Sequence, residues 1–383
     1  MRVFIETTPR YSGGYLAHLK GILSSGGIPG HVSAYVHCNP ALADDIGAVD
    51  PQVVMLTDKA YGSSIPYLYV WGRKILPELL EKHKIDVLFN TNALRGSANT
   101  AGIPRVTISH NLLPFEDEEL RRYGLFGKGR LRLEILRFLQ KRSFESADGV
   151  ICLSEYAREL AEKVCRLKRS AVIPHGISEA FRNPPKTLPQ NGPLKLLYVS
   201  SQYIYKHHWN VVLAVHRLRK ITGRDLTLDL VGVGELETTE PRASEKLRDA
   251  MASVGDSSFV KMRGSVPYRE MQDVYRGADI FVFASSCETF GNILLEAMSA
   301  GLPIACSNKR PMSDILGDGG VYFSPHDPDS IAVAILSLMD RPDESARRAE
   351  MAIARSKGYS WTRCARETFS FIEEVHNGKN SRV

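Results

Sequence analysis

Short apolar runs alternate along the chain with segments whose apolar residues recur at helical spacing. The runs are almost continuously apolar, as strands buried on both faces must be. They are 2–7, 31–37, 53–57, 86–90, 105–110 and 149–154 in the first half, and 194–200, 227–232, 259–264, 280–285, 303–307 and 320–325 in the second. The clearest helical segments are 15–24, 74–83, 208–220, 268–277 and 328–340. This order predicts an α/β protein with two parallel, doubly wound sheets.

A proline-rich stretch, RNPPKTLPQNGP at 182–193, separates the two halves. Prolines and polar residues in this density are typical of a domain boundary. We therefore predict one Rossmann-like domain over 1–182 and a second over 193–359. Segment 360–377 has the pattern of an amphipathic helix that packs back on the first domain. Ligands of such sheets bind at the carboxyl ends of the strands, which predicts a cleft between the domains.

Length and composition narrow the class of protein. A chain of 383 residues with 43% hydrophobic and 24% charged residues is typical of a soluble, multidomain globular protein. The six cysteines are scattered without paired spacing, which indicates reduced thiols in a cytoplasm-like compartment. No apolar run is long enough to span a membrane, and the chain starts with a strand-like segment. We therefore expect neither a spanning helix nor a signal peptide.

One segment is strongly basic although the net charge is only +6. Residues 120–142 carry eight Lys or Arg against one acid, Glu134. The apolar stripe of the predicted helix is Leu131, Ile135, Phe138 and Leu139, and its mainly cationic stripe is Arg130, Glu134, Arg137 and Lys141. Such a helix can lie on an anionic membrane surface, or it can bury its apolar stripe within the domain. Nucleic-acid binding is disfavoured because the segment has no regular pattern of interleaved aromatic residues and the rest of the chain is near charge balance.

The run ETFGNILLE at 288–296 follows a predicted strand and opens a predicted helix of about 292–300. Thr289 and Asn292 are candidate N-cap residues, and Gly291 allows a ligand to approach the backbone. A helix N-terminus with free N–H groups suits a diphosphate. The two glutamates at the ends of the run can accept hydrogen bonds from hydroxyls at opposite ends of one extended ligand. From the spacing alone, however, the favoured interpretation is one helix-capping acid and one solvated acid.

The surrounding segment 284–328 closely resembles the donor-binding region of retaining GT-B glycosyltransferases of family 4, group 1. It contains that family's two glutamates eight residues apart, its AM-x-x-G-x-P turn and its G-D-x-G-x-x-x-x-P segment, in this order. The resemblance extends to IPHGI at 173–177, YVSSQYIYKHH at 198–208, GSVPY at 264–268 and RGADIFVFAS at 276–285. It thus covers nearly the whole second domain and implies two facing Rossmann-like domains.

The resemblance implies roles for particular residues. Glu288 would contact hydroxyls of the donor sugar and Glu296 the ribose, while backbone groups at Phe290, Gly291, Asn292 and Ile293 would face the diphosphate. Lys206 would hold the donor phosphates, and the backbone of Val266 would contact the base. The family usually has an arginine just ahead of the lysine, and this chain has none in SSQYIY. Ser200, Ser201, His207 or backbone donors are the candidate replacements.

The first domain resembles the family less closely, as expected for a domain that binds a variable acceptor. Gly13 and Gly14 follow the first strand and can form a turn with exposed N–H groups near the diphosphate. His110 ends a predicted strand and matches the family's histidine near the reacting sugar. Tyr15, Thr91 and Asn92 are further candidates to line the cleft.

The implied activity is transfer of a sugar, with retention of configuration, from a GDP- or UDP-linked donor of which a mannose-type sugar is one candidate. The acceptor would be a glycan or a lipid-linked glycan in polysaccharide or glycoconjugate biosynthesis. No His/Cys/Asp cluster has metal-ligand spacing, so we expect no cofactor and no metal. The predicted location is the cytoplasm, including the inner face of the membrane if the basic helix binds there.

Other functions fit the sequence less well. A nicotinamide-dependent dehydrogenase is disfavoured because ETTPRYSGGY replaces G-x-G-x-x-G after the first strand, and GVGELE at 232–237 lacks the third glycine. A sugar-nucleotide epimerase would lack this glutamate pair, and a phosphorylase would need a longer chain or a pyridoxal cofactor. A non-catalytic nucleotide-sugar-binding protein remains an alternative because of the missing arginine. The donor, base, acceptor, linkage and oligomeric state are not determined by the sequence.

Overall fold

A computed structural model describes residues 1–8, 13–94, 102–124, 127–234 and 240–380. The chain forms two compact units. The first unit contains Met1–Gly176 and Tyr359–Val383, and the second contains Ile177–Gly358. Each unit is a parallel sheet with helices, which confirms the predicted α/β class with two doubly wound sheets.

The first unit has a seven-stranded parallel sheet with the order β3-β2-β1-β4-β5-β6-β7. The register pairs Val3 with Ala34 on one side and with Val87 on the other. The central strands are buried on both faces because helices cover them, which explains their continuous apolar runs. The strands are β1 Arg2–Glu6, β2 Ser33–Cys38, β3 Val53–Thr57, β4 Val87–Asn90, β5 Arg105–Ser109, β6 Gly149–Cys152 and β7 Ser170–Val172.

Helices connect most of the consecutive strands, as is usual for parallel pairing. The described part of the connection from β4 to β5 contains none. The α-helices of the first unit are α1 Gly13–Leu23, α2 Pro40–Ile46, α3 Ile65–Val70, α4 Leu76–Lys82, α5 Asp117–Arg122, α6 Lys128–Ser146, α7 Glu155–Val164 and α15 Trp361–Asn380. A π-helical turn, Trp71–Ile75, joins α3 to α4, and a 3-10 turn covers Leu113–Phe115.

The second unit has a six-stranded parallel sheet with the order β10-β9-β8-β11-β12-β13. Its strands are β8 Leu194–Val199, β9 Leu226–Val231, β10 Val260–Arg263, β11 Ile280–Phe283, β12 Ile304–Ser307 and β13 Val321–Phe323. Its α-helices are α8 His208–Thr222, α9 Pro241–Ser253, α10 Met271–Arg276, α11 Asn292–Ser299, α12 Met312–Leu316, α13 Pro328–Asp340 and α14 Pro342–Ser356. Its 3-10 turns are Glu179–Phe181, Ile204–Lys206, Tyr268–Glu270 and Gly317–Gly319.

All twelve predicted strands are present, with ends that differ by a few residues. The pattern missed β7, because this edge strand has only three residues, all half-buried, and no apolar run of its own. The predicted helix 74–83 is confirmed as α4, although its first turn is the π-helical turn Trp71–Ile75.

The proline-rich segment 182–193 lies inside the second unit, whereas we predicted that it separates the domains. Asn183 N–H donates to Ser299 O at 3.1 Å, and Lys186 N–H donates to Gly301 O at 2.8 Å. The segment therefore packs along the C-terminal end of α11. The chain crosses between the units earlier, at Gly176–Ile177.

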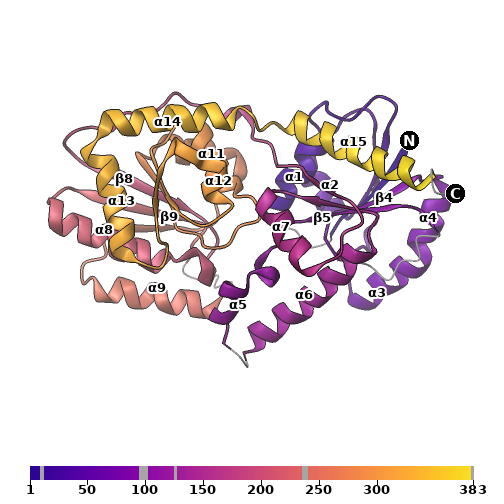
Figure 1. The fold of residues 1–383 in the computed structure, drawn as a ribbon, viewed down its shortest axis with the longest axis horizontal. Coiled ribbons are helices and arrows are strands. Elements are labelled where there is room, and N and C mark those ends of the chain that lie inside the picture. Colours follow the sequence, from indigo (N-terminus) through magenta and orange to yellow (C-terminus); the bar gives the residue numbers. More distant parts are fainter. Residues whose placement is uncertain (9–12, 95–101, 125–126, 235–239, 381–383) are drawn as a thin grey trace. The chain divides into compact units, whose positions relative to one another are not determined.

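The C-terminal helix α15 belongs to the first unit, where it packs on α1 (Figure 1). Small residues allow the close approach. A Cβ on Gly21 would lie 2.2 Å from the Trp361 ring, and one on Gly149 would lie 2.7 Å from Val375. Because no larger side chain fits at these glycines, they determine where α15 can lie.

The basic helix α6 turns its predicted apolar stripe to solvent. Leu131, Ile135, Phe138 and Leu139 are 64, 52, 57 and 46% exposed, and Leu133, Gln140, Ser143 and Phe144 face inward instead. The interpretation that α6 buries this stripe in its domain is therefore wrong. The mainly cationic stripe is paired: Arg130 bonds Glu134, Arg137 bonds Asp117, and Lys141 lies near Glu145.

All six cysteines are buried, and none forms a disulfide bond. Burial raises the pKa of the Cys38 and Cys165 thiols to about 11, which keeps both protonated. Among the helices of the described residues, none combines the length and apolar content needed to span a bilayer.

Candidate functional site

Lys206 and Glu288, both predicted site residues, form an ion pair in the second unit. Lys206 ends the turn after β8, and Glu288 lies in the loop between β11 and α11. The Lys206 Nζ contacts Glu288 Oε1 and lies 5.5 Å from the centre of the Phe283 ring. The lysine is only 6% exposed. Because an ammonium group has three donors, the contact with Glu288 leaves it able to bind a further anion.

Three further bonds join the segment around Lys206 to the loop of Glu288. Ser286 N–H donates to Tyr205 O at 2.8 Å, and the Ser286 hydroxyl donates to the same oxygen at 3.2 Å. His207 Nε2 and Ser286 Oγ share a hydrogen bond of 2.9 Å. The residues on both sides of Lys206 are therefore attached to a residue two positions before Glu288.

Glu296 lies one turn inside α11 and is buried. The Tyr275 hydroxyl donates to Glu296 Oε2 at 2.8 Å. Burial raises the pKa of Glu296 to about 7, although the bond from Tyr275 lowers it. Burial, and to a smaller extent the Glu296 carboxylate, raise the pKa of the Tyr268 phenol, although the residue is half exposed. Glu296 thus has one fixed partner and capacity for more hydrogen bonds, since a carboxylate accepts several.

The start of α11 differs from the prediction. The N-cap residue is Gly291, in the left-handed region with φ 101°, and no side chain caps the helix. The prediction of Thr289 or Asn292 as N-cap is therefore wrong, because the sharp turn needs a residue without a Cβ. Phe290 is buried, and Asn292 and Ile293 are half-buried. The positive end of the α11 dipole lies at this turn, beside the loop of Glu288.

The candidate replacements for the missing arginine have different environments. Ser200 is buried, and its hydroxyl shares a hydrogen bond of 2.9 Å with His208 Nε2. Ser201 is exposed after β8, whereas His207 is 1% exposed and bonded to Ser286. Val266 is half-buried in the loop after β10. Of the side chains considered as replacements, only Ser201 is open to solvent.

In the first unit, His110 follows β5 and packs against three aromatic rings. Its ring centre lies 5.0 Å from that of His18, 5.6 Å from that of His175 and 5.7 Å from that of Tyr15. Burial, and the neighbouring His175, lower the pKa of His110 to about 3. His110 is therefore a neutral imidazole at physiological pH, and it can exchange hydrogen bonds with a hydroxyl but carries no charge.

The other predicted residues of the first unit lie around the carboxyl ends of β1 and β4. Gly13 and Gly14 open α1 and are exposed. The Tyr15 hydroxyl accepts from Thr8 N at 3.0 Å and lies 2.5 Å from Thr91 Oγ1. Asn92 is half-buried, and its side chain accepts from Leu94 N. Thr8 and Thr91 thus hold the hydroxyl of the buried Tyr15, whereas Gly13 and Gly14 are open to solvent.

Sequence reasoning missed Glu6, a buried carboxyl at the end of β1. Asn90 Nδ2 donates to Glu6 Oε2 at 2.6 Å. Burial raises the pKa of Glu6 to about 7, against the effects of Asn90 and Arg105. The sequence signal for this residue was an acid at the end of an otherwise apolar strand. A carboxyl group at that position lies at the sheet edge where ligands of parallel sheets bind.

Two family models match the chain in adjacent segments. Glycosyltransferase Family 4 matches residues 40–181, and Glycosyl transferases group 1 matches residues 180–355. The second match contains the Lys206–Glu288 pair, Glu296 and the start of α11. The first contains His110.

Among curated relatives, the chain is 35% identical over 114 residues to O-antigen chain mannosyltransferase B of Escherichia coli, which covers 29% of each chain. It is 30% identical over 228 residues to a glycogen synthase of Mycobacterium tuberculosis, covering 58% of this chain and 53% of that protein. It is also 30% identical over 136 residues to a D-inositol 3-phosphate glycosyltransferase of Thermobispora bispora, covering 34% and 32%. The chain thus spans about half the length of these relatives or less.

Solved structures share the fold over the whole chain. Sucrose-phosphate synthase from Thermosynechococcus elongatus has a TM-score of 0.76 at 17% identity, covering 99% of this chain and 100% of that one. Anabaena HepE in complex with UDP and glucose has a TM-score of 0.72 at 17% identity, covering 98% and 100%. At these identities the likeness concerns the fold alone. Together with the two family matches, it identifies the chain as a member of the family 4, group 1 glycosyltransferases with the GT-B fold of two Rossmann-like domains.

Proposed function

We propose that this protein transfers a sugar, with retention of anomeric configuration, from a nucleoside-diphosphate sugar to a glycan or lipid-linked acceptor. The observation that carries the proposal is the ion pair of Lys206 and Glu288 beside the start of α11, with Glu296 one turn along the same helix. This arrangement offers a cation, a helix N-terminus and two carboxylates to one extended ligand. A GDP- or UDP-linked sugar, including a mannose-type one, has the matching groups.

The donor would bind the second unit. Its diphosphate would lie at the start of α11, where the helix dipole and Lys206 both favour negative charge. Glu296 would accept hydrogen bonds from the ribose, and Glu288 from sugar hydroxyls. The backbone at Val266 would contact the base. The complexes of Anabaena HepE with UDP and UDP-glucose support this class of donor.

The chemistry follows from the charge that develops as the glycosidic bond breaks. The bond between sugar C1 and the diphosphate oxygen breaks, and the leaving nucleoside diphosphate gains negative charge. A fixed ammonium at Lys206 stabilises that charge more in the transition state than in the ground state. The acceptor oxygen forms the new bond to C1 on the same face. Because the new bond forms on the face that the leaving group occupied, configuration is retained, and the acceptor proton passes to the leaving phosphate oxygen.

His110 would contribute as a neutral group in the first unit, where the acceptor would bind. A neutral imidazole can orient a sugar hydroxyl without a charge that competes with Lys206 for the phosphates. We propose that no metal or other cofactor takes part, because Lys206 and the α11 dipole can stabilise the leaving group. Loss of transfer on addition of a chelator would contradict this part of the proposal.

The first experiment is thermal stabilisation by GDP, UDP and ADP of the wild type and of Glu296→Ala. A ligand that binds only the folded state raises the melting temperature. We expect one nucleotide to stabilise the wild type and to lose most of its effect in the variant. If no nucleotide stabilises the wild type, the donor site is wrong. The anomeric signal of the product in proton NMR then tests retention.

The main alternative is a protein that binds nucleotide sugars without transferring them. The absence of an arginine in SSQYIY favours it, since phosphate binding would rest on fewer cations. Release of free nucleoside diphosphate from UDP-glucose or GDP-mannose separates the two functions. Nucleotide binding without turnover for any donor and acceptor would support the alternative. An epimerase would instead convert the donor sugar without releasing the diphosphate.

We also propose that α6 binds an anionic membrane surface on the cytoplasmic face. Its exposed apolar stripe, Leu131, Ile135, Phe138 and Leu139, is flanked by the exposed cations Lys128, Arg132 and Arg142. The apolar side chains can enter the interface while the cations contact acidic headgroups. This location would bring the enzyme to a lipid-linked acceptor.

Vesicle binding tests this membrane site. We expect the wild type to sediment with vesicles that contain phosphatidylglycerol, less so at high salt. The double variant Ile135→Ser/Phe138→Ser should lower the affinity on the order of tenfold for each side chain that no longer enters the interface. Val333→Ser on α13, 67% exposed, is the matched control and should bind as the wild type does. Equal binding by the double variant would exclude this surface.

A further inference from the structure

His207 has a backbone conformation that histidine rarely adopts. Its φ is 49° and its ψ is 35°, in the left-handed region, at the N-cap of α8. A side chain with a Cβ costs free energy there, and glycine would not. A residue stays in this region only when interactions of its side chain or its surroundings offset the free-energy cost of the backbone conformation. The question is what the imidazole contributes.

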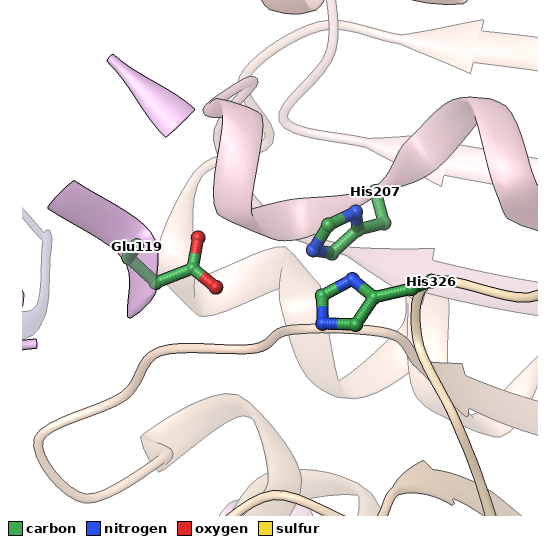
Figure 2. A group of neighbouring side chains, drawn as sticks. All are labelled: Glu119, His207 and His326. Atoms are coloured by element: carbon green, nitrogen blue, oxygen red, sulfur yellow. The ribbon is translucent and has the colours of Figure 1, made fainter. Parts of the chain in front are cut away.

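The ring of His207 is buried and held from several sides. Besides the hydrogen bond to Ser286, its centre lies 5.2 Å from the Trp209 ring and 4.7 Å from the His326 ring. Figure 2 shows the close approach of the rings of His207 and His326. The ring therefore has one orientation, with Nε2 directed at Ser286.

We propose that His207 is a positioning residue that keeps the Lys206 ammonium at the phosphate-binding position. The inference rests on the proposed function. The two residues that flank Lys206 both bond Ser286: Tyr205 through its carbonyl oxygen and His207 through its ring. The backbone on both sides of Lys206 is therefore fixed to the loop that carries Glu288. The left-handed turn is what brings the imidazole back to Ser286 while α8 begins at the next residue.

This role differs from that of a phosphate ligand. The imidazole is 1% exposed, so a donor would not touch it without displacing its neighbours. A bound diphosphate would instead meet Lys206, whose position His207 sets. A chain that lacks the usual arginine depends more strongly on the placement of its remaining cation. The free energy lost to the strained backbone at His207 is then the cost of holding the Lys206 ammonium in place.

The variant His207→Gly tests the proposal, because glycine accepts the backbone conformation and removes only the imidazole. We expect it to fold, by circular dichroism and melting temperature, and to bind pyrophosphate, UDP and GDP about tenfold more weakly in calorimetry. Ser286→Ala should act in the same direction. Lys84→Gly, at a left-handed position in the first unit with φ 50°, is the matched control and should bind as the wild type does.

A double-variant cycle on nucleotide binding shows whether His207 acts through Lys206 or through the structure in general. If His207 acts through Lys206, then Lys206→Ala/His207→Gly binds no more weakly than Lys206→Ala alone. Full wild-type affinity in His207→Gly, or losses that multiply in the double variant, would overturn the inference. If the wild type binds none of the three probes, the proposed function fails and not this inference alone.

Discussion

A Cβ on Gly176 would lie 2.1 Å from the backbone N of Trp361, so these two residues of the first unit touch backbone to backbone. Gly176 is the last residue before the chain enters the second unit, and Trp361 starts α15 soon after it returns. The residues next to the two crossings thus lie side by side within the first unit. The neighbouring His175 ring packs 5.4 Å from the Trp361 ring.

We therefore expect Gly176→Ala to destabilise the first unit. The added methyl meets backbone atoms, which cannot move aside as a flexible side chain can, so the loss should be on the order of 3 kcal/mol. Urea denaturation measures it. Gly30→Ala, where nothing lies within 4 Å of the new Cβ, is the control. Equal stability of the two variants would mean that α15 is not docked as described.

Gly13→Ala should leave the stability unchanged and lower the activity instead. A Cβ there has nothing within 4 Å, and the residue opens α1, so the melting temperature should stay the same or rise slightly. If the donor diphosphate approaches the backbone at Gly13, the methyl occupies that space, and donor turnover should fall at least about tenfold. Unchanged turnover would remove Gly13 from the site.

Glu296 should make stability depend on pH in a defined direction. Its folded pKa of about 7 exceeds its usual value of 4.5, so the folded state retains a proton that the unfolded state loses. Stability from this group is complete below pH 4.5 and is lost as the pH rises to 7. The two values correspond to about 3 kcal/mol. Glu296→Gln lacks this loss, so its stability relative to wild type should rise across that range. A constant difference at pH 4.5 and pH 8 would contradict the buried placement of Glu296.

His18 allows a test of the histidine cluster. Within the described part of the chain, neither ring nitrogen of His18 has a hydrogen-bond partner, and the side chain is fully buried. An unsatisfied buried polar group costs about 2 kcal/mol, part of which the ring stack with His175 at 4.8 Å returns. His18→Leu should therefore raise stability by about 1 kcal/mol, a shift of a few degrees in melting temperature. A lower melting temperature would show that these nitrogens bind a partner in solution.

Local sequence was enough to locate the strands and the glutamate pair. The twelve strands follow from apolar runs because a strand covered on both faces must be apolar along its length. Glu288 and Glu296 belong to one loop and one helix, so their spacing in the chain determines their spacing in the molecule. A short edge strand such as β7 has no such signal, because its residues are only half-buried.

Tertiary structure alone decided which partners these residues meet. Lys206 and Glu288 are separated by 82 in sequence, and Tyr275 and Glu296 by 21. Strand order and helix packing bring each pair together, and no local sequence pattern contains that information. His18, His110 and His175 meet because their elements converge in one unit. The sequence also did not determine which face of α6 is buried, because α6 has apolar residues on two sides. Packing against neighbouring elements buries the side that contains Leu133 and Phe144. The sequence thus determines the elements and their chemistry, and packing determines which groups act together.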